Sequence, residues 1–235
     1  MQRYREGTKF FRVKKLEGPK LPNPRFGKYK DYWETESKYI KNYSRINKPG
    51  ESMLYVSSDL RCSIGEVKVK KDEFFVAIQY TAKSEVKVNM IGGEFDYDAM
   101  GVFDGKVKLI HEMYNSFLRD EFSRDVGEGT EYLYKISEQI AKMYYDLPPR
   151  LVQDAWAYTS VKDKNKYNVC FRPEIARDIL KLDGDMICKL DEKDEIRVYT
   201  VAVGADEKEN ILFYPMGSDE QKKTFPHLKS GKETD

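Results

Sequence analysis

Segments typical of strands and helices follow one another in this chain without the regular βαβ alternation of a parallel sheet. The run Phe74–Tyr80 is almost entirely apolar, which is typical of a central strand. Further strands are expected at 10–13, 53–56, 86–90, 156–158 and 168–171, the last two separated by a turn at 162–165. Apolar residues at helical spacing predict helices at 60–67, 109–117 and 133–143. The sequence therefore predicts an α+β fold around one antiparallel or mixed sheet.

A single domain is expected to account for residues 1–216 of the 235. Its core falls at about 10–190, and a closing hairpin is expected at 195–214. Pro, Gly, Lys and Tyr are frequent at 18–43, which favours an irregular but ordered arm. The polar segment 217–235 is predicted to be a disordered and dispensable tail.

The charge balance points away from nucleic acid and from an anionic membrane as partners. There are 41 Lys and Arg against 40 Asp and Glu, so the net charge is +1. Tyrosines and lysines alternate between Tyr29 and Tyr43 as on a single-strand stacking surface, but the acids among them favour a packed arm. No apolar run approaches the ~18 residues of a membrane span, and the first residues do not form a signal sequence, so a cytoplasmic location is expected.

The sequence contains few residues that could form a metal site, a catalytic triad or a glycine-rich phosphate loop. Its three cysteines form no CxxC pair and only two histidines accompany them, so neither a disulfide framework nor a zinc site is expected. A triad built on histidine has no candidate partners. The acidic segment Gly92–Asp98 lacks the spacing of a calcium loop, and no glycine-rich phosphate motif follows a strand. No metal site is therefore predicted.

Several polar residues stand where strands and helices are expected to end. Arg45 lies in a turn before the strand that carries Tyr55, Glu66 lies on the helix that follows, and Ser160 ends a later strand. Taken singly, each has an ordinary explanation: a turn arginine, a tyrosine alternating out of a strand, a solvated glutamate and a serine at a strand end. Their chemistry becomes specific only as a set.

The set, with its neighbours, resembles the RES domain, a family named for its Arg, Glu and Ser. The similar segments occur in the family's order: Arg45-Ile46-Asn47-x-x-Gly50, Leu54-Tyr55-Val56, Ile64-Gly65-Glu66-Val67, Ala157-Tyr158-Thr159-Ser160-Val161 and Asn168-Val169-Cys170-Phe171. The resemblance covers about Phe10 to Leu190. The sequence departs from the family at Ser44, where glycine is common, and at 62–65, where a turn rich in Thr and Ala is usual.

This resemblance implies a fold like that of ADP-ribosyltransferases, with a split, mixed β-sheet and surrounding helices around a cleft for NAD⁺. Relatives consume NAD⁺, some as phosphorylases and others by transferring ADP-ribose to a protein, and many look like toxins held in check by an Xre-type antitoxin. The implied partners are thus NAD⁺, such an antitoxin and, as an open possibility, a second copy of the chain. No cofactor is implied beyond NAD⁺ as substrate, with phosphate as a possible co-substrate.

The two central residues suit cleavage of the bond between nicotinamide and ribose. Nicotinamide leaves as a neutral group, so the reaction needs no general acid and the scarcity of histidine is no objection. The transition state resembles an oxocarbenium ion, which the carboxylate of Glu66 could stabilise. Arg45 offers a planar fork of donors to the pyrophosphate or to an incoming phosphate.

The remaining candidates would bind substrate. Tyr55 is expected to stack on nicotinamide, Ser160 to donate a hydrogen bond to the carboxamide or the nucleophile, and Asn47 and Asn168 to shape the site. The expected function is an NAD⁺-degrading enzyme that uses phosphate or water as acceptor. A protein ADP-ribosyltransferase and a non-catalytic interaction module remain as alternatives.

Overall fold

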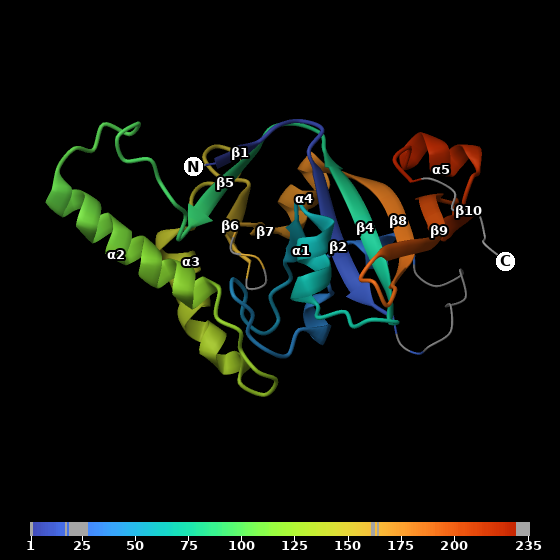
Figure 1. Cartoon of the computed structure of the whole chain (residues 1–235), viewed down its shortest axis with the longest axis horizontal. Helices are drawn as coiled ribbons and strands as arrows, with labels where there is room; N and C mark the ends of the chain where they lie inside the picture. Colours follow the sequence, from blue (N-terminus) through green and yellow to red (C-terminus); the bar gives the residue numbers. More distant parts are fainter. Residues whose placement is uncertain (1, 17, 19–27, 161–162, 164, 229–235) are drawn as a thin grey trace.

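A computed structural model describes residues 2–16, 18, 28–160, 163 and 165–228 (Figure 1). Within them one open sheet has the strand order β1-β5-β6-β7-β3-β2-β4-β8-β9-β10, and only the β5–β6 pair is parallel. The strands are β1 Gln2–Tyr4, β2 Lys9–Lys15, β3 Leu54–Ser57, β4 Phe74–Ala82, β5 Val86–Ile91, β6 Ala155–Thr159, β7 Tyr167–Phe171, β8 Leu180–Leu190, β9 Ile196–Ala205 and β10 Ile211–Pro215. The prediction of an α+β fold with a mixed sheet is confirmed.

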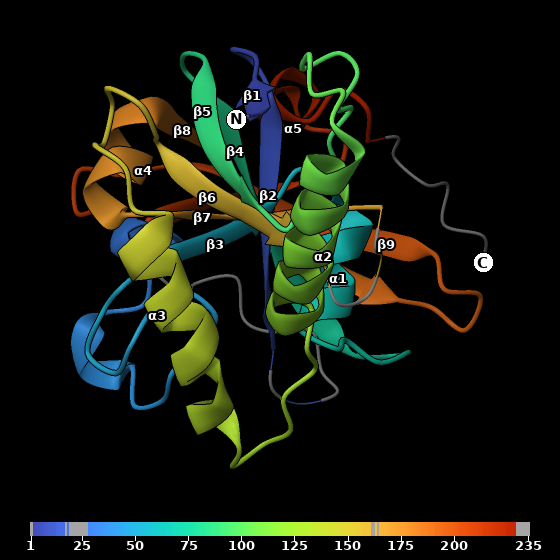
Figure 2. The same cartoon turned by 90° about the vertical axis from the view of Figure 1, so that its left-hand side faces the viewer.

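Helices cover the sheet unevenly. They are α1 Leu60–Glu66, α2 Gly105–Phe122, α3 Tyr134–Tyr144, α4 Pro173–Ile179 and α5 Asp219–Thr224, with short 3₁₀ segments η1 Tyr29–Tyr32, η2 Ser37–Tyr39 and η3 Glu131–Leu133. Figure 2 shows α2 and α3 in front of β6 and β7. No helix in the described part of the chain is long and apolar enough to cross a membrane.

The sheet nearly divides in two between β2 and β3. These strands share a single register pair, Phe11 with Ser57. By contrast, β2 pairs with β4 along its whole length, from Lys9 to Lys15, and β3 pairs with β7 at four positions. The two halves, β1-β5-β6-β7-β3 and β2-β4-β8-β9-β10, therefore diverge from a fork at this point.

Three apolar clusters hold the halves and their helices together. The largest joins β2, β4, β6 and β7 to α4 and to the arm, and it contains Phe10, Trp33, Tyr80 and Phe171. A second lies between β4, β8 and β9 and the helices α1 and α5, and a third lies between β5, β6 and β7 and the helices α2 and α3. Because the first cluster spans the fork, side-chain packing connects the halves where backbone pairing does not.

The local predictions for β2, β3, β4, β5, β6, β7, α1 and the closing hairpin are confirmed. The arm is confirmed over its described residues 28–43, where Tyr32 and Trp33 are buried. Residues 19–27 of the arm and 161–162 and 164 near the predicted turn lie outside the described residues. The long strand β8 was not predicted, because Asp183, Gly184 and Asp185 interrupt its apolar pattern.

The prediction of a disordered tail from 217 is wrong for residues 218–228. There Ser218 caps α5 by accepting a hydrogen bond from the backbone of Gln221, and Phe225 is fully buried against β9 and its neighbours. Phe225 docks the helix together with the partly buried Met216 and Leu228, and burial of its aromatic ring alone contributes a few kcal/mol. Residues 229–235 lie outside the described residues.

Replacing this ring tests whether the segment is part of the fold. We expect Phe225→Ala to lower the free energy of unfolding by about 3 to 5 kcal/mol, because it leaves a cavity beside β9. Lys222→Ala, at an exposed position of the same helix, should change it by no more than about 0.5 kcal/mol. Urea unfolding followed by circular dichroism measures both; equal effects of the two variants would contradict the docked helix.

Candidate active site

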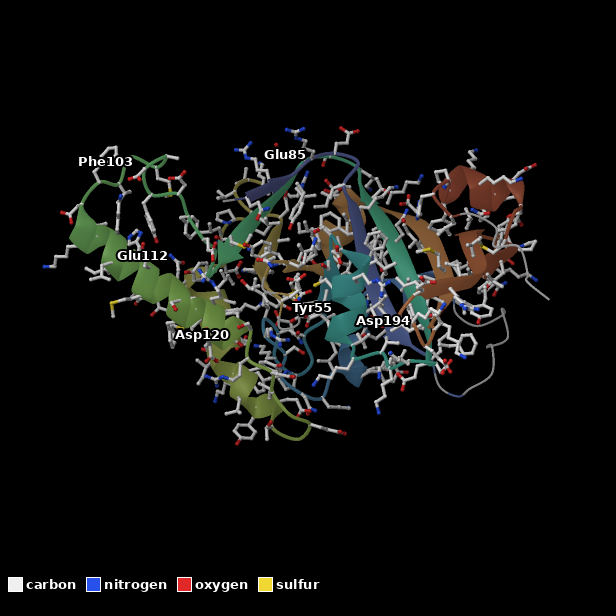
Figure 3. All side chains as sticks on the ribbon, viewed as in Figure 1. Tyr55, Glu85, Phe103, Glu112, Asp120 and Asp194 are labelled. Atoms are coloured by element: carbon white, nitrogen blue, oxygen red, sulfur yellow. The ribbon has the colours of Figure 1, made fainter. Side chains whose placement is uncertain are left out.

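A pocket of about 300 Å³ opens at the fork between β2 and β3. Its walls come from β2, β3, α1, β6, β7 and the turn before β3. Four of the six predicted site residues line it: Arg45, Tyr55, Glu66 and Asn168. Figure 3 shows Tyr55 at the centre of the molecule, beside α1. Segments far apart in the sequence thus converge on one cavity.

Glu66 reaches the pocket as the last residue of a short helix. The side chain of Asp59 caps α1 by accepting a hydrogen bond from the backbone of Cys62, and the helix ends before Val67 and the left-handed Lys68, at φ 53°. A carboxylate at a helix C-terminus is unfavourable, because the carbonyl end of the helix dipole is also negative. The position of Glu66 therefore lowers the stability of α1 but places a carboxylate in the pocket.

Ser160 lies directly against this carboxylate. Its hydroxyl donates to Glu66 Oε1 at 2.5 Å, and its own backbone N–H donates to the carbonyl of Lys166 at 2.9 Å. Ser160 is fully buried at the end of β6, so its hydroxyl is held in place rather than solvated. A hydrogen bond to a charged acceptor is roughly twice as strong as a neutral one, which fixes the orientation of the carboxylate.

Arg45 is anchored to the connection after α2. Its Nε donates to the carbonyl of Phe122 at 2.7 Å and its Nη2 to the carbonyl of Arg124 at 3.1 Å. The guanidinium carbon lies 4.9 Å from the ring centre of Tyr134 and 5.7 Å from that of Tyr158. Two backbone carbonyls and two rings therefore hold the cation on the pocket wall.

The electrostatic surroundings keep Arg45 charged. Burial disfavours its charge, but the phenol groups of Tyr158 and Tyr134 and the carboxylate of Glu66 together raise its pKa. Burial raises the pKa of Tyr158, a shift that the charge of Arg45 opposes. The phenol of Tyr158 accordingly stays neutral, and Glu66 is an acidic neighbour of this cation.

Asn47 lies behind Tyr55 and is not among the residues that line the pocket. The Tyr55 hydroxyl donates to Asn47 Oδ1 at 2.6 Å and accepts from the backbone N–H of Ile46 at 3.3 Å. The Asn47 amide in turn donates to the carbonyl of Glu51 at 3.0 Å, and the residue is 2% exposed. The geometry makes Asn47 a positioning residue for the Tyr55 ring.

Asn168 offers the pocket an unused donor. The residue is 6% exposed, and its Oδ1 accepts a weak hydrogen bond from the Cys62 thiol at 3.9 Å. Its Nδ2 is buried and has no hydrogen-bond partner among the residues that the structure describes. Buried amides in folded proteins are almost always paired, so this one is well placed to donate to a ligand.

Two cations on β2 also line the pocket and were not predicted: Arg12 and Lys14. Burial and the neighbouring charge of Arg12 lower the pKa of Lys14 to about 8. The alternation of basic residues along the predicted strand was the available signal, but an outward-facing basic row on an edge strand looks the same. The side chain of Arg12 donates to the carbonyl of Trp33 and that of Lys14 to the carbonyl of Asp31, so the arm holds both cations at the pocket wall. The described lining thus contains three cations, counting Arg45, and the carboxylate of Glu66, which suits an anionic ligand that carries a local positive charge.

Comparison with protein-family models gives no match, and comparison with curated proteins gives none either. In the described part of the chain, no group of three or more His, Cys, Asp and Glu side chains could hold a metal ion. The chemistry of the pocket is therefore inferred from its own residues.

The two asparagines provide a matched test of the pocket. Asn168→Leu should raise the free energy of unfolding by about 1 kcal/mol in the ligand-free protein, because it removes an unpaired buried donor. Asn47→Leu should lower it by about 2 to 4 kcal/mol, because the Tyr55 O–H loses its acceptor and the Glu51 carbonyl loses its donor. Urea titration of both variants measures the difference. A large loss of stability in Asn168→Leu would show that its amide is already paired.

Proposed function

We propose that this chain degrades NAD⁺ by cleaving the bond between nicotinamide and ribose, with phosphate or water as acceptor. The observation that carries the proposal is the carboxylate of Glu66, oriented by Ser160 at 2.5 Å in a pocket that Arg45 also lines. In a pocket of this composition, one fixed negative charge can stabilise a developing cation while the positive groups hold phosphates.

The bond-breaking step needs mainly electrostatic stabilisation from the protein. As the bond to nicotinamide stretches, positive charge moves from the nicotinamide ring to the ribose, and the leaving group departs neutral. A carboxylate beside the ribose stabilises that charge, and it can accept a hydrogen bond from a ribose hydroxyl. Ser160 keeps the carboxylate from rotating away, so little reorganisation is needed during the reaction.

The other residues of the pocket suit different parts of the dinucleotide. Arg45 and the β2 cations Arg12 and Lys14 suit the pyrophosphate or an incoming phosphate. The Tyr55 ring, held by Asn47, offers a face for nicotinamide, and the Asn168 amide can donate to its carboxamide oxygen. A volume of about 300 Å³ lies at the lower end of small-molecule pockets, which suits the nicotinamide riboside half.

The same proposal includes membership of the RES family and an ADP-ribosyltransferase-like fold, supported by the order of the sequence motifs and by the fork in the sheet. A toxin role in the cytoplasm, restrained by an Xre-type antitoxin, follows from that resemblance. Incubation with NAD⁺ labelled in the adenylate separates the outcomes. ADP-ribose 1″-phosphate or free ADP-ribose supports the proposal; label on protein favours a transferase, and no turnover favours an interaction module.

Glu66→Gln tests the carboxylate. We expect the turnover number to fall roughly 100- to 1,000-fold, because the variant keeps the shape of the side chain but loses its charge. Glu192→Gln, at an exposed position in the loop after β8, is the matched control and should retain full activity. Loss of NAD⁺ is measured by chromatography, with circular dichroism to verify folding. A folded Glu66→Gln enzyme with near-normal turnover would rule out the assigned role.

Lys14 predicts a pH dependence of substrate binding. Its pKa of about 8 means that its charge is present below this pH and lost above it. The pyrophosphate of NAD⁺ keeps its charge over this range, so KM for NAD⁺ should rise several-fold between pH 7 and 9. Lys14→Arg stays protonated and should remove the rise. Steady-state kinetics at constant ionic strength measure this, and identical profiles for the two proteins would assign the dependence to another group.

A further inference from the structure

Helix α2 projects from the molecule with most of its length unpacked. Its buried residues are confined to the C-terminal end: Leu118, Glu121 and Phe122. Figure 1 shows the rest of the helix extending beyond the sheet. A helix of this kind gains little stability from its own backbone, because helical stability in proteins comes mainly from packing of an apolar face.

The projecting part carries an apolar stripe that faces away from the body. At 100° per residue, six exposed apolar residues fall within an arc of about 160°. They are Val107, Leu109, Ile110, Met113, Tyr114 and Phe117. Met113 is 65% exposed and Phe117 54%, whereas Leu118 and Phe122 fall outside this arc, about 100° and 140° from its centre, and are buried. The apolar residues whose spacing predicted the helix therefore do not pack against its own sheet.

The stripe is large enough for a stable interface. Large side chains that are more than half exposed each present roughly 100 Å². Six side chains of the stripe and the preceding loop are more than half exposed: Met100, Phe103, Leu109, Met113, Tyr114 and Phe117. With Val107 at 39% and Ile110 at 47%, they present on the order of 700 Å², close to one side of a standard protein interface. Monomeric proteins rarely expose a patch above about 300 to 600 Å².

Charges at the two ends of the stripe indicate what covers it. Lys106 lies at the N-terminal end and Asp120 near the C-terminal end, both exposed and both on the apolar side by helical position. An antiparallel pair of α2 helices with its two-fold axis at Met113 places each Lys106 opposite Asp120 of the other copy. It also places Leu109 opposite Phe117. A parallel pair would bring like charges together at both ends.

We propose that the chain forms a two-fold symmetric homodimer through antiparallel pairing of the exposed stripes of α2. The surface is self-complementary in charge, as a two-fold interface requires. The described C-terminal helix α5 lies at the opposite end of the molecule in Figure 1, so it does not cover the stripe. The inference rests on α2 alone and does not depend on the chemistry of the pocket.

Charge reversal tests the pairing. We expect sedimentation equilibrium to show a dimer, and Lys106→Asp or Asp120→Lys to raise its dissociation constant at least tenfold. The double variant, or an equimolar mixture of the two single variants, should restore dimerisation, because each contact again joins opposite charges. Glu112→Lys changes the charge by the same amount as Asp120→Lys but lies on the opposite face, so it should have little effect.

Cross-linking tests the register. The native Cys62, Cys170 and Cys188 are buried, so Met113→Cys introduces an accessible thiol near the two-fold axis. Mild oxidation should convert this variant to a disulfide-linked dimer, while Glu112→Cys stays largely monomeric. A wild-type protein that remains monomeric at 100 µM would overturn the proposal, as would a dimer unaffected by all the charge reversals. A monomer that binds another protein through α2 would equally overturn it.

Discussion

The divergence of β2 from β3 is the constraint on which the site depends. Two adjacent strands that share only the Phe11–Ser57 pair leave the rest of their facing edges open, and the pocket forms in that opening. Residues on both sides of the gap then line one cavity, with Arg12 and Lys14 on one side and Tyr55 on the other. The apolar cluster around Phe10 and Phe171 keeps the two halves of the sheet together, so the fold stays intact despite the opening.

Local signals predicted the elements that depend on neighbouring residues. Apolar residues at helical spacing predicted α1, and the apolar run of β4 marked it as a central strand. Strand β8 escaped prediction because Gly184 is required by a long-range contact: a Cβ there would lie 2.0 Å from the carbonyl oxygen of Ala202 on β9. The docking of α5 likewise depends on a few apolar side chains, above all Phe225, in a polar segment whose composition resembles a loose tail.

In the candidate site, too, some residues could be predicted from the sequence and others could not. The motif order placed Arg45, Tyr55, Glu66 and Asn168 together, and the structure brings them to one pocket. The sequence could not show that Asn47 supports the Tyr55 hydroxyl from behind, because that contact depends on how the turn folds back on β3. Lys14 was missed because an open strand edge has the same basic pattern whether it faces solvent or a ligand.

The carbonyls that hold Arg45 belong to the last residue of α2 and the connection just beyond it. The guanidinium on the pocket wall is therefore hydrogen-bonded directly to the end of the projecting helix. If pairing of two copies orders α2, the guanidinium is ordered with it, and occupancy of the pocket and association of the chains become thermodynamically linked. Such linkage is reciprocal: an anion bound at Arg45 would tighten the dimer by the same factor by which the dimer tightens the anion.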